Sequence, residues 1–133
     1  MDFFKTILTQ YSNGNVSIYL VNGEYIRDNL HIDFVEGDND AHNPALLEPG
    51  EVWIDCDQSG SEFRANMVHE LTERRLMLTQ RMTYGQAHDE ANNAEQFARR
   101  HREQLEDLVQ AELKLAPPLN KPEVVQETVR WQR

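Results

Sequence analysis

The amino-acid sequence predicts an α+β fold in which a small N-terminal β-rich region precedes two long helices. β-Branched and aromatic residues gather in short runs within the first 55 residues. Two helix-capping patterns open long segments in the second half. A chain of 133 residues suits one compact domain, so we expect a single domain over residues 1–115 and a C-terminal tail over 116–133.

The first expected strand is the run VSIYLV at residues 16–21, which is rich in β-branched and aromatic residues. Asn22 and Gly23 follow it and form a strong turn signal, and Tyr25 and Ile26 come next. This pattern predicts a β-hairpin. Residues 32–35 (IDFV) are expected to add a further strand.

A loop and a short strand are expected next. The segment GDNDAHNPALLEPG at residues 37–50 is crowded with Gly, Asn, Asp and Pro and predicts a loop. EVWID at residues 51–55 predicts a strand. Its alternation puts Val52 and Ile54 on one face and Trp53 and Asp55 on the other, as in a half-buried strand.

The first long helix is expected to start at the capping box formed by Ser59 and Glu62 and to run to about Met82. A helical period places four apolar residues on or near one buried stripe. They are Phe63, Met67, Leu71 and Leu78.

A second capping box, Thr83 with Gln86, predicts a second helix that reaches roughly Leu115. Four small residues on this helix favour close packing by a neighbouring element. They are Ala87, Ala91, Ala94 and Ala98. The prolines in residues 116–122 then stop the helix and predict a tail.

The net charge of -10 comes from one part of the chain. Residues 1–60 hold 11 acidic and 2 basic side chains, while residues 61–133 hold 12 and 11. Such a surface repels phosphate backbones, so we expect no direct nucleic-acid binding. This acidity has two interpretations: a solubilising surface, or imitation of DNA to occupy a DNA-binding partner.

No apolar run approaches the roughly 18 residues that cross a bilayer, and the first ten residues lack the pattern of a signal peptide. These features predict a soluble, cytoplasmic protein without a membrane partner. Cys56 is the only cysteine, so we expect neither an internal disulfide nor a thiolate-rich metal site, and interpret Cys56 as a small buried hydrophobe. Any metal must use nitrogen and oxygen ligands.

Three residues form a candidate metal site. His69 and Glu73 lie four residues apart on the first helix, about 40° apart around its axis, so both reach one ion. On the second helix His88 shares the stripe of Ala91, whose small side chain allows close approach of the two helices. Two imidazoles and one carboxylate suit zinc and occur in catalytic zinc sites.

Residues 51–98 resemble the core of the zincin metallopeptidases, especially the gluzincin branch. The resemblance consists of strand EVWID, helix HELTE and helix AHDEANNAE. Gluzincins carry HExxH followed by ExxA, so the second histidine and the distal glutamate have exchanged places here. The larger pattern, including YIRDN, also resembles small zincin-like proteins of phages and prophages.

This resemblance implies zinc-dependent peptide hydrolysis of a peptide or protein substrate. His69, Glu73 and His88 would be the metal ligands, and Glu70 the general base. The substrate would lie along VWID as an added β-strand. Three residues are candidates for stabilising the oxyanion, namely Arg27, Tyr84 and His42.

Simpler roles remain open for several of these residues. Glu70 has Arg74 four residues on, a spacing that allows an ordinary helical ion pair. Glu95 is a candidate fourth ligand or a second acceptor that fixes an imidazole tautomer, and its simpler role is an ion pair with Arg99. The loop residue His42 is expected at the surface.

Two other classes of function also remain. A binding protein would use the metal only as a staple, with the tail as a docking segment through Val124, Val125, Val129 and Trp131. Alternatively, Glu70, Glu73, Glu90 and Asn93 resemble the ExxE and ExxD helices of the all-α nucleotide pyrophosphohydrolases, which hold magnesium. Asn93 stands there in place of an aspartate.

Overall fold

A computed structural model describes residues 4–58 and 60–119 of the chain. Its four-stranded sheet has the order β1-β2-β4-β3 and comes before the long helices, so the predicted α+β class is confirmed. The strands are β1 (Lys5–Ile7), β2 (Ser17–Val21), β3 (Gly37–Asn39) and β4 (Glu51–Asp55). The helices are η1 (Thr9–Tyr11), α1 (Gly23–Asn29), α2 (Gly60–Gln80), α3 (Tyr84–Arg100), η2 (Arg102–Gln104) and α4 (Leu105–Leu115).

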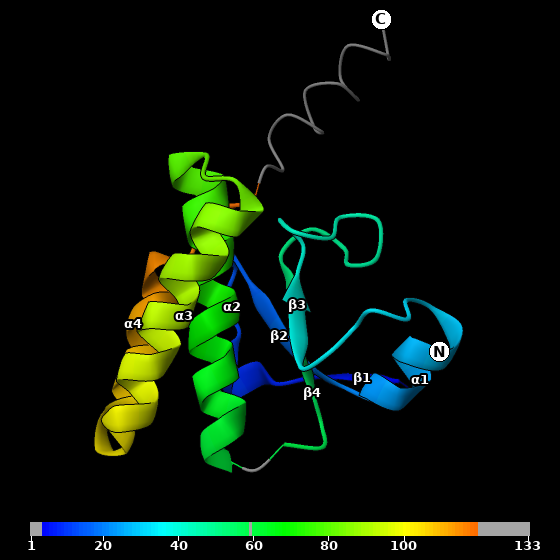
Figure 1. Ribbon diagram of the computed structural model, residues 1–133, viewed down its shortest axis with the longest axis horizontal. Helices are drawn as coiled ribbons and strands as arrows, with labels where there is room; N and C mark the ends of the chain where they lie inside the picture. The colour runs from blue at the N-terminus through cyan, green and yellow to red at the C-terminus, as the bar shows by residue number, and fades with distance from the viewer. Residues whose placement is uncertain (1–3, 59, 120–133) are drawn as a thin grey trace, which may run out of the picture.

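The sheet is mixed, and its strand order makes β1 and β3 the two edge strands. β2 pairs with β1 in antiparallel and with β4 in parallel, and β3 pairs with the other side of β4 in antiparallel. β4 therefore lies in the middle of the sheet and β3 lies at one edge. Figure 1 shows α2, α3 and α4 on one side of this sheet and α1 on the other.

Both faces of the sheet are covered. Val52 and Ile54 pack with α2 and α4 in the larger core, whereas Trp53 packs with Ile26 of α1 and Phe34 in a smaller one. All five residues of β4 are buried, so the prediction of a half-buried strand was wrong. The strand alternates as expected, but α1 and the residues after it cover the face that was expected to meet solvent.

The predicted hairpin at Asn22 and Gly23 was also wrong. The Asn22 side chain instead accepts a hydrogen bond from Tyr25 N and caps α1. An asparagine before a glycine suits a turn and a helix N-cap alike, and the parallel pairing of β2 with β4 requires a crossover, which α1 begins.

The strand expected at residues 32–35 is absent from the described structure, where Ile32 and Val35 are exposed in a loop. The edge strand β3 lies a little later, within the segment expected to be loop. The exposed Cys56 also contradicts its expected burial.

The first long helix forms as predicted and ends two residues before Met82, while Ser59 lies outside the described residues. Of its expected apolar stripe, Met67 and Leu71 are buried, Phe63 is partly buried and Leu78 is exposed.

The capping box of Thr83 and Gln86 is present with both of its hydrogen bonds. The second helix does not run unbroken to Leu115, because His101 leaves helical geometry with φ -126° and ψ 58°. The break lets α4 turn back and bury Leu105 against the core beside α2.

The last described residues continue along the domain. Ala116 is buried, and its carbonyl accepts a hydrogen bond from the Asn15 side chain. The tail residues proposed for docking lie outside the described residues. Across residues 4–58 and 60–119, none of the helices has the length and apolar character needed to cross a membrane.

Candidate metal centre

The structure brings the three predicted metal ligands together. Glu73 Oε2 lies 3.3 Å from His69 Nε2 and 2.9 Å from His88 Nδ1. His69 and Glu73 are buried, whereas the His88 side chain is 38% exposed. Ligand atoms of the three residues lie within 4.8 Å of one another, so the group could hold a metal ion.

The sharp reversal between α2 and α3 makes this convergence possible. Arg81 has φ 55°, in the left-handed region, and turns the chain immediately after α2. Thr83 then caps α3, which runs back along α2. Ala87 and Ala91 are fully buried, and their small side chains let α3 approach closely enough for His88 to reach Glu73.

Each buried ligand also has an outer partner. His69 Nδ1 lies 2.9 Å from Glu95 Oε1, at ion-pair distance. Glu95 also pairs with Arg99, so both roles considered for it occur together. Asn39 Nδ2 donates to Glu73 Oε1 over 2.9 Å, which leaves Glu73 Oε2 toward the two imidazoles.

Glu70 is buried beside this group rather than in it. Its Oε1 accepts the other hydrogen bond of Asn39 Nδ2, also 2.9 Å long. The simpler role considered for it is not found, because Arg74 turns to Asp40, with Nε 2.6 Å from Asp40 Oδ1. Glu70 therefore does not form the helical ion pair with Arg74.

Sequence reasoning missed Asn39, which is fully buried between the two carboxylates. It sits in a polar segment whose composition predicts loop, and no local pattern distinguishes it from its polar neighbours. Only the pairing of β3 with β4 brings Asn39 against α2.

The pKa values reflect this crowding. Burial and the charge of Glu73 raise the pKa of Glu70 to about 8. Burial alone would lower the pKa of His69, but hydrogen bonding to Glu73 and Glu95 outweighs it and raises that pKa to about 10. The pKa of Glu73 is lowered, since bonds to the two histidines outweigh its burial. The bond from His69 lowers the pKa of Glu95.

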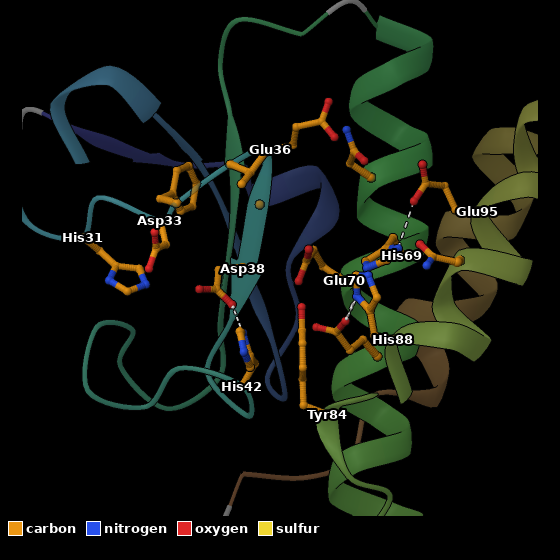
Figure 2. Close-up of a pocket in the computed structure, with 16 residues that line it drawn as sticks. His31, Asp33, Glu36, Asp38, His42, His69, Glu70, Tyr84, His88 and Glu95 are labelled. Carbon is orange, nitrogen blue, oxygen red and sulfur yellow. Dashed lines mark hydrogen bonds and ion pairs between the residues drawn. The ribbon is translucent and has the colours of Figure 1, made fainter. Parts of the chain in front are cut away.

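The group opens into a cleft of about 660 Å³ between α2, α3 and the loop that leads into β3. Figure 2 shows His69, Glu70 and His88 on one side of it and Asp38 and His42 on the other. Four of the chain's five histidines line this cleft.

Two of the three candidates for oxyanion stabilisation lie in the cleft. The ring of Tyr84 stacks on His42 at 3.7 Å between centroids, and His42 Nδ1 lies 3.0 Å from Asp38 Oδ1. Burial, followed by the charges of Glu73, Glu70 and Asp38, raises the pKa of Tyr84 to about 12, which keeps its hydroxyl a proton donor. Arg27 lies elsewhere, 3.7 Å from Asp55.

The arrangement expected for a pyrophosphohydrolase is not found. Glu90 and Asn93 are exposed on α3 and do not line the cleft that contains Glu70 and Glu73. The sheet is a further difference from an all-α protein.

Asn39→Asp should destabilise the protein, because it replaces a donor to two buried carboxylates with a third negative charge. We expect a loss of about 1–3 kcal/mol or more in the free energy of unfolding, measured by urea denaturation. Asn93→Asp, the same change at an exposed position of α3, is the matched control. Equal stability of the two variants would contradict the assigned role of Asn39.

The metal-free protein should lose stability as the pH rises. Folding raises the pKa of Glu70 from 4.5 to about 8 and that of His69 from 6.5 to about 10, so the folded state binds more protons across this range. The free energy of unfolding therefore falls with pH. Glu73 and Glu95, whose pKa values are lowered, stay ionised and add no slope.

Thermal unfolding in excess chelator at about pH 6, 7 and 9 measures this effect. The Tm should fall at each step, and Glu70→Gln should flatten the lower half of the range. A Tm that rises through this range would show that the two groups are not held as described.

Comparison with known families and proteins adds no assignment. No protein-family model matches the chain, no curated protein matches it, and no solved structure matches it. The zincin resemblance therefore stays a prediction, and the geometry of the cleft is the basis for inferring a function.

Proposed function

We propose that the chain is a zinc-dependent metallopeptidase of the zincin type, with His69, Glu73 and His88 as ligands and Glu70 as general base. The observation that carries the proposal is the orientation of the ligands. Nε2 of His69, Oε2 of Glu73 and Nδ1 of His88 face one another. Glu95 contacts the other ring nitrogen of His69, and Asn39 contacts the other carboxylate oxygen of Glu73. Outer partners of this kind orient metal ligands in proteins.

The donor set fits zinc. Tetrahedral ligands about 2.0–2.1 Å from zinc lie roughly 3.3 Å from one another. The distances from Glu73 Oε2 to the two histidine nitrogens are 3.3 and 2.9 Å, so small side-chain shifts would complete the geometry. The chain's one cysteine, Cys56, is outside the cleft, so the site offers only the nitrogen and oxygen donors of a catalytic His₂Glu centre.

The side chains of the cleft suit amide hydrolysis. A zinc ion held by these ligands would supply Lewis acidity, which polarises a carbonyl and makes water a nucleophile near neutral pH. Glu70, whose pKa is raised to about 8, suits a base that takes a proton near neutral pH and returns it to the leaving amine. The hydroxyl of Tyr84 and the imidazole of His42 are the donors available to a developing oxyanion.

The edge of the sheet suits a peptide substrate, although not at the strand expected from the sequence. VWID belongs to β4, and both of its edges are paired. β3 is the edge strand beside the cleft, and its Gly37 lines the cleft. A substrate strand would thus add to β3, as zincin substrates add to an edge strand.

A metal staple without turnover is the second candidate. It is supported by the placement of the ligands on both α2 and α3, because a metal held there would tie the two helices together. Zinc content and the turnover of the Glu70→Gln variant separate the two candidates.

Protein purified without chelator should carry about one zinc per chain, and His69→Ala should lose it. We expect saturating zinc at about 100 times its Kd to add about 2.7 kcal/mol to the free energy of unfolding of the wild type. His101→Ala, a histidine outside the cleft, is the control and should keep both properties. A wild type without zinc, or zinc retained equally by His69→Ala, would end both candidates.

Glu70→Gln should keep its zinc and lose turnover. Removal of a general base lowers kcat about 100-fold or more on a peptide-library substrate. Glu90→Gln changes an exposed acid on α3 and should keep wild-type kcat. Equal activity of Glu70→Gln and wild type, including none in either, would exclude Glu70 as the base and favour the staple.

A further inference from the structure

We infer that the cleft selects extended peptides with a basic side chain, which Asp33 and Glu36 recognise beside a main-chain anchor at Gly37. The inference rests on the proposed function for the role of the bound peptide, but its binding test does not depend on turnover.

The charge of the cleft favours a cationic ligand. Among the described residues that line it, none is lysine or arginine, whereas six are carboxylic acids. These acids are Asp33, Glu36, Asp38, Glu70, Glu73 and Glu95. A cleft lined by one sign of charge concentrates ligands of the opposite sign.

Most of these acids already have partners inside the protein. Glu73 meets two histidines, Glu95 meets Arg99, and Asp38 meets His42. Glu70 is buried and accepts a hydrogen bond from Asn39. The inner acids therefore leave little charge for a ligand.

Asp33 and Glu36 differ from the inner acids. Both are exposed on the loop that forms the outer wall, and within residues 4–58 and 60–119 no ion pair is found for either. Arg27 of α1 donates to the carbonyls of Phe34 and Val35 in this loop and lies near Asp55. Arg27 thus fixes the loop through its backbone and leaves the two carboxylates uncompensated. Figure 2 shows them along the wall that faces His69.

A main-chain anchor lies next to these carboxylates. Asp55 N donates to Glu36 O, and Asp40 N donates to Glu51 O, so alternate residues of this edge bond to β4. The antiparallel ladder then turns N–H and C=O of Gly37 away from β4. Asn39 has the same orientation, but its N–H bonds to the Asp38 side chain and its C=O accepts from Asn43 N.

Gly37 is thus the residue of β3 with both groups available for an added strand. A peptide residue opposite it would exchange two hydrogen bonds. The next residue would stand opposite Glu36, with Cβ atoms about 4.5–5.5 Å apart, where opposite charges stabilise the pair. The basic side chain is therefore expected one position from the residue anchored at Gly37.

The space around Gly37 is too tight for a side chain. A Cβ there would lie 2.9 Å from Trp53 O of β4 and 3.3 Å from Glu70 Cγ of α2, so a larger residue would displace β3 from both elements. The absence of a side chain keeps the peptide path close to Glu70.

Fluorescence anisotropy with the zinc-loaded full chain carrying Glu70→Gln tests the inference. The probes are labelled alanine-based peptides with one central Arg, Lys, Gln or Glu. The Arg and Lys peptides should bind most tightly and the Glu peptide least, and the advantage should shrink in high salt. Metal-free wild-type protein should give the same ranking, which keeps the test independent of the Glu70 substitution.

Glu36→Gln and Asp33→Asn should each weaken binding of the Arg peptide roughly two- to fivefold, as expected for exposed ion pairs. Glu24→Gln, an exposed acid of α1 outside the cleft, is the matched control and should not change binding. N-methylation of the residue before Arg should weaken binding in every variant, since it removes the hydrogen bond to Gly37.

Equal binding of the Arg and Gln peptides, or equal effects of Glu36→Gln and Glu24→Gln, would overturn the inference. Absence of binding by every peptide would also overturn it. Basic peptides that bind but are never cleaved by zinc-loaded wild type would contradict the peptidase proposal and support the inference. Neutral peptides cleaved as fast as basic ones would overturn the inference and leave the peptidase proposal intact.

Discussion

The side-chain amide of Asn39 donates one hydrogen bond to Glu70 and one to Glu73, and this buried contact holds the edge strand β3 against the middle of α2. Two carboxylates so close together and buried are costly, and one donor to each offsets part of that cost. The same contact turns Glu73 toward the histidines and places Gly37 beside Glu70. The position of β3, the orientation of the triad and the wall of the cleft therefore all depend on one amide.

α2 is an unusual core helix because charged residues fill its buried middle. His69, Glu70, Glu73 and Arg74 are all buried, and each has a partner outside α2. β3, α3 and the segment after β3 supply Asn39, His88 and Asp40. Polar groups buried in this way stabilise a fold less than apolar packing does. The concentration of His69, Glu70 and Glu73 along one cleft is more typical of a functional site than of a structural core.

The helical parts of the site were predictable because their signals are local. Spacing by four residues brings His69 and Glu73 to one face of any helix, and the box of Thr83 and Gln86 marks where the next helix starts. A short turn between two helices makes them antiparallel neighbours, so His88 could be placed near the pair. For the N-terminal part, the sequence predicted its β-rich character but not its individual strands and turns. Asn22 suits both a turn and a helix cap, and the sequence around it does not choose between them.

The sequence by itself determined the α+β class, the α2 and α3 helices and the triad they carry, because these depend on contacts within a few turns of one helix or across one short turn. Tertiary structure decided the rest. It decided that β3 is the edge strand, that Asn39 joins two acids and that His42 and Tyr84 share the cleft with Glu70. These features depend on contacts between residues far apart in the sequence, such as the 31 and 34 positions that separate Asn39 from Glu70 and Glu73. No periodic pattern in the sequence marks such contacts or the order of the strands.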